Sequence, residues 1–150
     1  MDWMQQGAFD LGSFASFVGI RPSQDGRGLD VTAVGDSLLA ILDSDALTLT
    51  FPYTSADQFD ASPRLLSTDM RHNRRDSTEP LILHRTIHHG SGSRRRYLLM
   101  TDALGHWLLS YPDRVPELLE LTEMGIIEFV ASERASGRLR RDDTTLLVCE

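Results

Sequence analysis

Residues 97–104 read Tyr-Leu-Leu-Met-Thr-Asp-Ala-Leu, an apolar run that ends on Asp102. Residues 141–148 read Arg-Asp-Asp-Thr-Thr-Leu-Leu-Val, so here Asp142 and Asp143 come first and the apolar run follows. We expect a strand that ends before Asp102 and a second strand that begins after Asp143. If the two strands are antiparallel neighbours, these ends share one sheet edge, about 5 Å apart across the ladder. The pattern predicts that the carboxylates converge.

A third aspartate lies in Ala33-Val34-Gly35-Asp36-Ser37, where a small-residue turn or bulge interrupts an apolar stretch. Carboxylates gathered at one edge repel each other unless a proton or a cation neutralises them, and oxygen ligands suit Mg²⁺ and Mn²⁺. We therefore predict an Mn²⁺ or Mg²⁺ site. Its candidate ligands are Asp36, Asp102, Asp142 and Asp143.

Each aspartate also has an ordinary structural explanation. Asp102 could cap a helix that starts at Ala103, and Asp142 could shape a turn. Asp36 could lie at the edge of a hairpin and pair with a nearby arginine. The order and strand context of the three motifs together favour the metal site over these alternatives.

The rest of the chain predicts an α+β domain that spans residues 1–150 as one unit. Gly26 and its polar neighbours form a turn, and 52–80 is an irregular connection. We expect 81–88 and 97–101 to pair antiparallel, and 29–42 to form a hairpin with 46–51 through an acidic turn at 43–45. The predicted strands are 7–20, 29–42, 46–51, 81–88, 97–101 and 144–149, and the predicted helices are 103–110, one with Pro116 in its first turn, and 125–136 with Gly137 after it.

The bulk properties exclude several classes of protein. With 22 acids against 15 bases the net charge is −7, which argues against a nucleic-acid binder that relies on a broad positive field. No apolar run approaches the ~20 residues of a membrane-spanning helix, and residues 1–13 lack the pattern of a signal peptide. Cys149 is the single cysteine, so we expect a reducing compartment and a cytoplasmic protein.

In order along the chain, Val34-Gly35-Asp36-Ser37, then residues 98–104, then residues 141–148 resemble bacterial members of the protein phosphatase 2C family. Residues 7–9 leading to 17–19, and Phe51-Pro52, add to the resemblance. It implies a β-sandwich flanked by helices, with a two-metal centre that activates water to hydrolyse phosphoserine or phosphothreonine in a phosphoprotein substrate. It also implies that Asp102 and Asp142 are metal ligands and that Asp36 belongs to an additional, weaker metal site.

The sequence departs from the family pattern in two places. Ala103 stands where family members usually have a glycine, a small change that keeps the turn compact. The family's early acidic motif and its Asp-Gly motif have no clear counterpart, because Asp25-Gly26 lies directly before the strand expected at Leu29 and reads better as a turn. We therefore expect the later part of the domain, which lacks its N-terminal portion and exposes apolar surface. Such a partial domain would associate with itself or with a partner chain.

Two clusters of basic side chains are further candidates for binding sites. Arg94, Arg95 and Arg96 could bind a substrate phosphate through bidentate hydrogen bonds, aided by Arg71, Arg74 and Arg75, although solvated loop charge is the ordinary explanation. His84, His88 and His89 are better explained as surface histidines than as zinc ligands, which need four converging donors.

Three hypotheses remain open at this point. The first is a metal-dependent serine/threonine protein phosphatase, for which the sequence identifies no catalytic side chain. The alternative is a catalytically inactive phosphatase-like module that binds phosphoproteins or regulates a kinase partner. A plain structural domain whose aspartates are caps is a third hypothesis.

Overall fold

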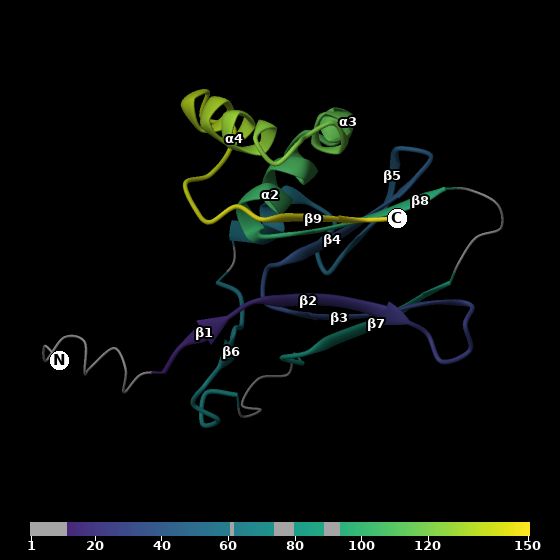
Figure 1. Ribbon diagram of the computed structural model, residues 1–150. Helices are drawn as coiled ribbons and strands as arrows, with labels where there is room; N and C mark the ends of the chain where they lie inside the picture. The colour runs from purple at the N-terminus through teal and green to yellow at the C-terminus, as the bar shows by residue number, and fades with distance from the viewer. Residues whose placement is uncertain (1–11, 61, 74–79, 89–93) are drawn as a thin grey trace, which may run out of the picture.

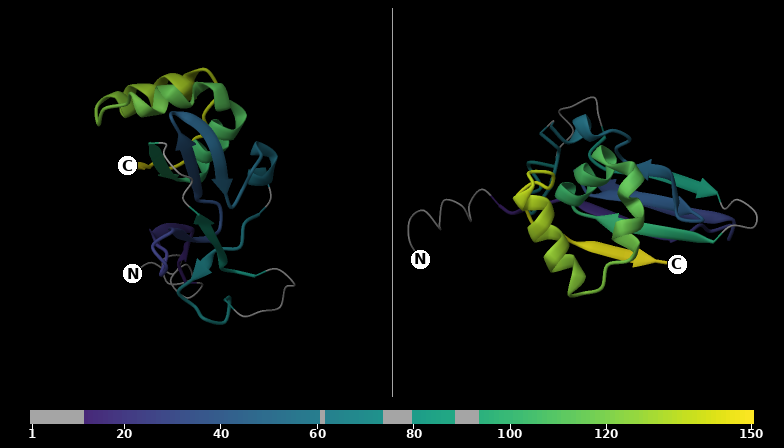
Figure 2. Two further views of the ribbon diagram at one scale, coloured as in Figure 1. Left: turned by 90° about the vertical axis from the view of Figure 1, so that its right-hand side faces the viewer. Right: turned by 90° about the horizontal axis from the view of Figure 1, so that it is seen from above.

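The structure is a computed structural model, and it describes residues 12–60, 62–73, 80–88 and 94–150. Two antiparallel sheets face each other, and helices cover the outer face of one of them (Figures 1 and 2). This arrangement agrees with the predicted α+β class. None of the helices among these residues has the length and apolar character needed to cross a bilayer.

One sheet has the order β2-β3-β7, and the other has the order β5-β4-β8-β9. A short ladder of β1 and β6 lies beside them. The strands are β1 Phe14–Ala15, β2 Phe17–Pro22, β3 Gly28–Val34, β4 Leu38–Asp43, β5 Ala46–Phe51, β6 Leu66–Ser67, β7 Leu83–His88, β8 Arg95–Met100 and β9 Leu146–Cys149. The helices are α2 Asp102–Ser110, α3 Val115–Leu119 and α4 Gly125–Ala135, with 3₁₀ turns η1 Ala56–Asp60 and η2 Pro112–Arg114.

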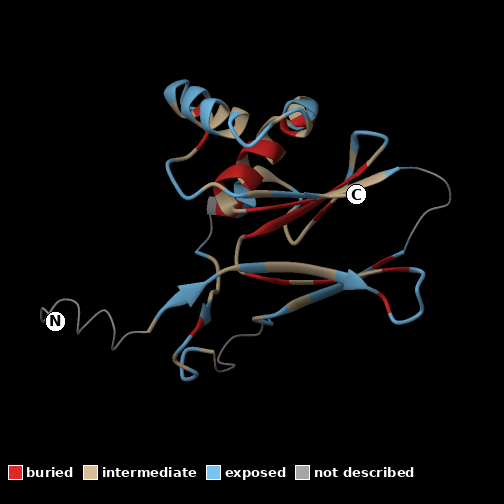
Figure 3. Ribbon diagram, viewed as in Figure 1, coloured by how far each residue is buried: buried red, intermediate tan, exposed pale blue. Residues whose placement is uncertain are grey.

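Buried residues lie along the four-stranded sheet and on α2 (Figure 3). Apolar side chains form a core on each face of this sheet. Side chains alternate between the two faces of a strand, so Leu98 and Met100 pack toward the helices while Leu99 packs toward the other sheet. Trp107 on α2 is fully buried in the helix-side core. The four-stranded sheet is therefore the central layer of the molecule.

The hairpin at 38–51 is confirmed, but the prediction of one strand over 29–42 is wrong. The chain turns at Gly35-Asp36-Ser37, so β3 belongs to one sheet and β4 to the other. Gly35 has φ +75°, a left-handed conformation that glycine adopts at little steric cost. The two strands read as one because both are buried and apolar, and nothing local in such a run specifies which sheet it joins.

The predicted pairing of 81–88 with 97–101 is also wrong. β7 pairs with β3, whereas β8 lies between β4 and β9. The two strands are consecutive in the chain but belong to opposite sheets of the sandwich. Sequential strands in a sandwich often change sheets, and the connecting residues carry no signal for that choice.

The helical predictions agree with the structure. Pro116 lies in the first turn of α3, where its missing N–H is not needed, and Gly137 follows α4 with φ +73°. The apolar residues of α4 are only partly covered: Phe129 and Val130 pack on the core, while Ile127 is 62% exposed.

Candidate functional site

The strand register brings Asp102 and the Asp142-Asp143 pair to one edge of the central sheet. Met100 at the end of β8 lies opposite Leu146 at the start of β9, and the two strands are antiparallel. Asp102 opens α2 directly after β8, and Asp142 and Asp143 come just before β9. The convergence of these two segments was predicted from the sequence, and the register confirms it.

Hydrogen bonds from Thr101 connect the segment before Asp102 to the segment before β9. Its hydroxyl donates to the backbone carbonyl of Asp143 over 2.9 Å and accepts from the N–H of Thr145 over 3.1 Å. Its own N–H donates to the carbonyl of Thr145 over 3.3 Å. Arg134 on α4 holds the same segment from the other side by donating to the carbonyl of Asp142 and to the hydroxyl of Thr144. The acidic segment is thus held by Thr101, between β8 and α2, and by Arg134 of α4.

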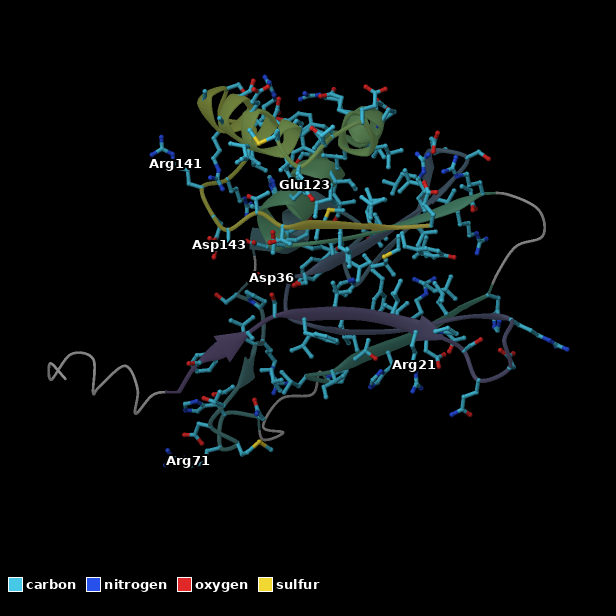
Figure 4. The ribbon with its side chains drawn as sticks, in the orientation of Figure 1. Arg21, Asp36, Arg71, Glu123, Arg141 and Asp143 are labelled. Carbon is cyan, nitrogen blue, oxygen red and sulfur yellow. The ribbon has the colours of Figure 1, made fainter. Side chains whose placement is uncertain are left out.

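Asp36 reaches the same end of the sandwich from the turn that joins the two sheets. Figure 4 shows Asp36 between the sheets and Asp143 where the chain enters β9. A Cβ atom at Gly35 would lie 2.8 Å from Leu65 Cδ2 and 2.9 Å from Ser16 Cβ, so the turn is closely packed as well as left-handed. The hydroxyls of Ser16 and Ser37 are 2.8 Å apart, a hydrogen bond that ties the residue after Asp36 to the residue before β2.

The electrostatics of the edge agree with this arrangement. Burial raises the pKa of the Asp102 carboxyl, and the carboxylates of Asp36 and Asp142 raise it further, while Arg140 opposes them. Burial likewise raises the pKa of the Tyr53 phenol, with a smaller contribution from Asp36. Asp102 therefore experiences the charge of both other aspartate motifs. We call Asp36, Asp102, Asp142 and Asp143 the acidic edge.

The acidic edge does not make a complete metal site. Among the residues that the structure describes, no three His, Cys, Asp or Glu side chains are grouped closely enough to hold one metal ion. Magnesium prefers about six oxygen ligands in octahedral geometry, with waters or substrate oxygens filling positions that the protein leaves open. Asp102 is half-buried while Asp142 and Asp143 are exposed, so the carboxylates differ in how firmly they are oriented.

The arginine triplet lies at the other end of β8 from Asp102, so the structure does not bring it to the acidic edge. All three side chains are already paired with acids. Arg95 binds Asp43 over 2.7 Å, and Arg96 binds Asp45 over 2.7 Å. Arg94 and Arg96 both bind Glu150, at 2.5 and 3.0 Å. These contacts hold the start of β8 to the end of β4, to the acidic turn between β4 and β5, and to Glu150.

The remaining candidates lie elsewhere. His84 and His88 are exposed on β7, and His84 faces the Thr32 hydroxyl at 3.0 Å. Arg71 forms a local ion pair with Asp69 in a loop. Asp25 accepts hydrogen bonds from Ser23 and Arg27 within a turn, as the sequence predicts. Arg74, Arg75 and His89 lie outside the described residues.

A groove of about 410 Å³ borders the acidic edge between α4 and the start of β9. One wall is apolar and comes from Ile126, Ile127, Val130 and Ala131 of α4. The other wall is polar and carries Asp142, Asp143 and Thr144, with Arg134 between them. The groove can take an apolar side chain next to a charged group.

The sequence reasoning missed Thr101, Tyr53 and Arg134 as parts of this site. Thr101 carried a signal, because a hydroxyl side chain directly precedes Asp102. Tyr53 and Arg134 carried none, because only the folded structure brings Tyr53 near Asp36 and turns Arg134 of α4 back to the carbonyl of Asp142. Comparisons of the chain with models of protein families, with curated proteins and with solved structures find no match.

Proposed function

We propose that this chain is a metal-dependent serine/threonine phosphatase domain of the phosphatase 2C type, and that its acidic edge contributes carboxylates to an Mn²⁺ or Mg²⁺ site. The observation that carries the proposal is the antiparallel register of β8 and β9, which puts Asp102 and the Asp142-Asp143 pair at one edge of the central sheet. The raised pKa of Asp102 beside Asp36 and Asp142 supports it. Asp36, Asp102 and Asp142 come from three separate segments at one end of a two-sheet sandwich, where the charges of Asp36 and Asp142 raise the pKa of Asp102. A hard divalent cation is the ligand that best offsets repulsion between such carboxylates.

Calorimetric titration with Mn²⁺ tests the metal site. We expect binding that weakens about tenfold or more in Asp102→Asn and in Asp142→Asn, because each loses a charged oxygen ligand. Asp113→Asn is the matched control, since Asp113 is an exposed aspartate on η2, outside the acidic edge. Equal Mn²⁺ affinity in the wild type and the three variants would exclude a metal site at the acidic edge.

Hydrolysis of a phosphoserine peptide, measured with and without Mn²⁺, tests the activity. The phosphatase proposal expects release of phosphate that needs Mn²⁺ and is lost in Asp102→Asn. The second candidate, an inactive phosphatase-like module, is favoured by the lack of three grouped metal-binding side chains in the described part of the chain. That candidate expects the phosphopeptide to bind without being hydrolysed by the wild type.

A further inference from the structure

Strand β9 forms one edge of the central sheet, and its outward backbone groups can be identified from the ladder. The N–H of Thr101 donates to the Thr145 carbonyl. Hydrogen-bonded pairs in an antiparallel ladder recur every second residue, so Leu147 and Cys149 bond to β8 in the same way. Leu146 and Val148 therefore direct their N–H and C=O groups away from the sheet. An edge of this kind is a template for another strand.

The side chains of β9 are apolar and exposed. Leu147 is 55% exposed and Val148 is 42% exposed. Leu147 lies opposite Leu99, on the face that turns toward the three-stranded sheet. The edge strand of that sheet, β2, contacts β8, so Leu147 lies at the border of the sandwich rather than inside it. The exposed Ile127 on α4 lines the groove beside Thr144 and extends the apolar surface.

The other three edges of the two facing sheets carry residues that discourage strand addition. β2 exposes Phe17 at its start but ends in Arg21 and Pro22, and β7 presents the exposed His84 and Arg85. β5 exposes Thr48 and Ala46 rather than large aliphatic side chains. Charge, proline and small polar residues are the usual means by which edges avoid pairing. By comparison β9 is built to accept a strand.

We propose that β9 pairs antiparallel with β9 of a second copy of this chain, about a two-fold axis that passes beside Leu147. In this register Leu146 of one copy lies opposite Val148 of the other, so the outward N–H and C=O groups of both copies are matched. The two Leu147 side chains meet at the axis and remove each other from water. The result is one continuous sheet across both copies.

The same register places a charged pair at each end of the interface. Arg94 precedes β8, and antiparallel pairing of the two β9 strands brings this end of β8 toward the start of β9 in the opposite copy, which Asp142 and Asp143 precede. Two strand spacings separate the backbones, about 10 Å, which an extended arginine and an aspartate side chain can span. Arg94 has a side chain that is 65% exposed, so it can contact Glu150 of its own copy and Asp143 of the other. The second copy thus brings an arginine to the acidic edge.

Four residues of strand make a small interface, so the equilibrium should be weak and depend on concentration. Sedimentation equilibrium of the full chain from about 1 µM to 1 mM covers this range. We expect a monomer–dimer equilibrium, and a chain that stays monomeric at the highest concentration overturns the proposal. The readout is independent of metal binding and of phosphatase activity, so its failure is distinct from failure of the proposed function.

Edge-charge variants then locate the interface. Leu147→Lys and Val148→Lys should each raise the dissociation constant about tenfold or more. The first puts two like charges directly opposite each other at the axis, and the second puts them diagonally across it and removes an apolar contact with Leu146 of the other copy. Met70→Lys is the matched control, since Met70 is an exposed apolar residue outside the sheet edge and should leave the constant unchanged. A dimer that tolerates both β9 variants would place the interface elsewhere and contradict the proposal. Circular dichroism confirms that each variant is folded.

A charge swap tests the register. Arg94→Glu alone and Asp143→Arg alone should each weaken the dimer severalfold, and the double variant should regain most of the loss. Losses that simply add would exclude this register. Hydrogen exchange of the unmodified chain gives a second test: the amides of Leu146 and Val148 should gain protection as concentration rises, while the Thr48 amide on edge strand β5 should not.

Discussion

Thr101 donates its hydroxyl hydrogen to the backbone carbonyl of Asp143 over 2.9 Å. This contact joins the residue before Asp102 to the segment that carries the other two acids of the edge. The position of one carboxylate relative to the others therefore depends on a neutral side chain that would not itself bind a metal.

Replacing Thr101 by valine tests this dependence. Valine keeps the shape but loses both hydrogen bonds of the hydroxyl, so we expect a loss of about 1 kcal/mol in the free energy of unfolding. Mn²⁺ affinity, measured by calorimetry, should fall although every carboxylate remains. Thr101→Ser keeps the hydroxyl and should bind Mn²⁺ nearly as the wild type does. Equal Mn²⁺ affinity in all three proteins would show that the hydrogen bonds of the Thr101 hydroxyl do not position the acidic edge.

Glu133 provides a prediction about stability. It is 3% exposed and accepts hydrogen bonds from Trp107 Nε1 at 2.7 Å and from Arg114 and Arg138 at 2.7–3.0 Å. Glu133→Ala leaves these donors without their partner, so chemical denaturation should show a loss of about 3–5 kcal/mol. Glu117→Ala is the matched control, because Glu117 binds the same Arg114 at the surface and should cost about 1 kcal/mol or less.

Acid should weaken the same network. Hydrogen bonds from Arg138, Arg114 and Trp107 lower the pKa of Glu133 far below its usual 4.5. A carboxyl whose pKa falls on folding contributes stability that is complete above its unfolded pKa and is lost as pH falls toward the folded value. Unfolding free energies measured between pH 7 and pH 3 should therefore decline below about pH 4.5 in the wild type. The decline should be shallower in Glu133→Gln, and parallel curves would contradict this role.

Asp102 should behave in the opposite way. Its pKa is raised on folding, so its contribution to stability is present below its unfolded pKa near 3.8 and is lost as pH rises through the folded value. Without divalent ions, Asp102→Asn should unfold at a higher temperature than the wild type at pH 7. The difference should shrink at pH 4, because the wild-type carboxyl with its raised pKa binds protons as the pH falls. Thermal melts of both proteins at the two pH values test this prediction. If Asp102→Asn melts at a lower temperature than the wild type at pH 7, the charge at Asp102 does not destabilise the fold.

Gly35 and Gly26 allow close packing to be separated from backbone strain. Both have positive φ, +75° and +68°, but a Cβ atom at Gly35 would clash with Leu65 and Ser16, whereas one at Gly26 meets nothing within 4 Å. Gly26→Ala should cost about 1 kcal/mol from left-handed strain alone, and Gly35→Ala about 2–4 kcal/mol. Equal losses on denaturation would show that the turn has room to relax.

The sequence was most informative where local pattern and strand ends decide the structure. The apolar run before Asp102 and the one after Asp143 predicted two strand ends at one edge, because an antiparallel ladder has few other ways to pair them. The hairpin of β4 and β5 followed from its acidic turn, in which Ser44 and Asp45 both have positive φ. These features depend on neighbours in the chain or on a single pairing.

Features set by distant contacts were not predictable in the same way. The turn at Gly35 moves the chain from one sheet to the other, and an apolar run does not encode which sheet it joins. Glu133 reads as an ordinary solvent-facing acid in a helix, and only the packing of Trp107, Arg114 and Arg138 around it explains its burial. The partners of the arginine triplet depend on the β4–β8 register, which sets Asp43 opposite Arg95.

The turn at 35–37 also has a mechanical consequence. It is a covalent bridge between the sheets, and it carries Asp36, while Asp102 belongs to the central sheet alone. Sliding one sheet over the other would shift these two carboxylates relative to each other. A ligand that binds both carboxylates would therefore resist sliding of one sheet over the other. The domain would be stiffer when the acidic edge is occupied than when it is empty.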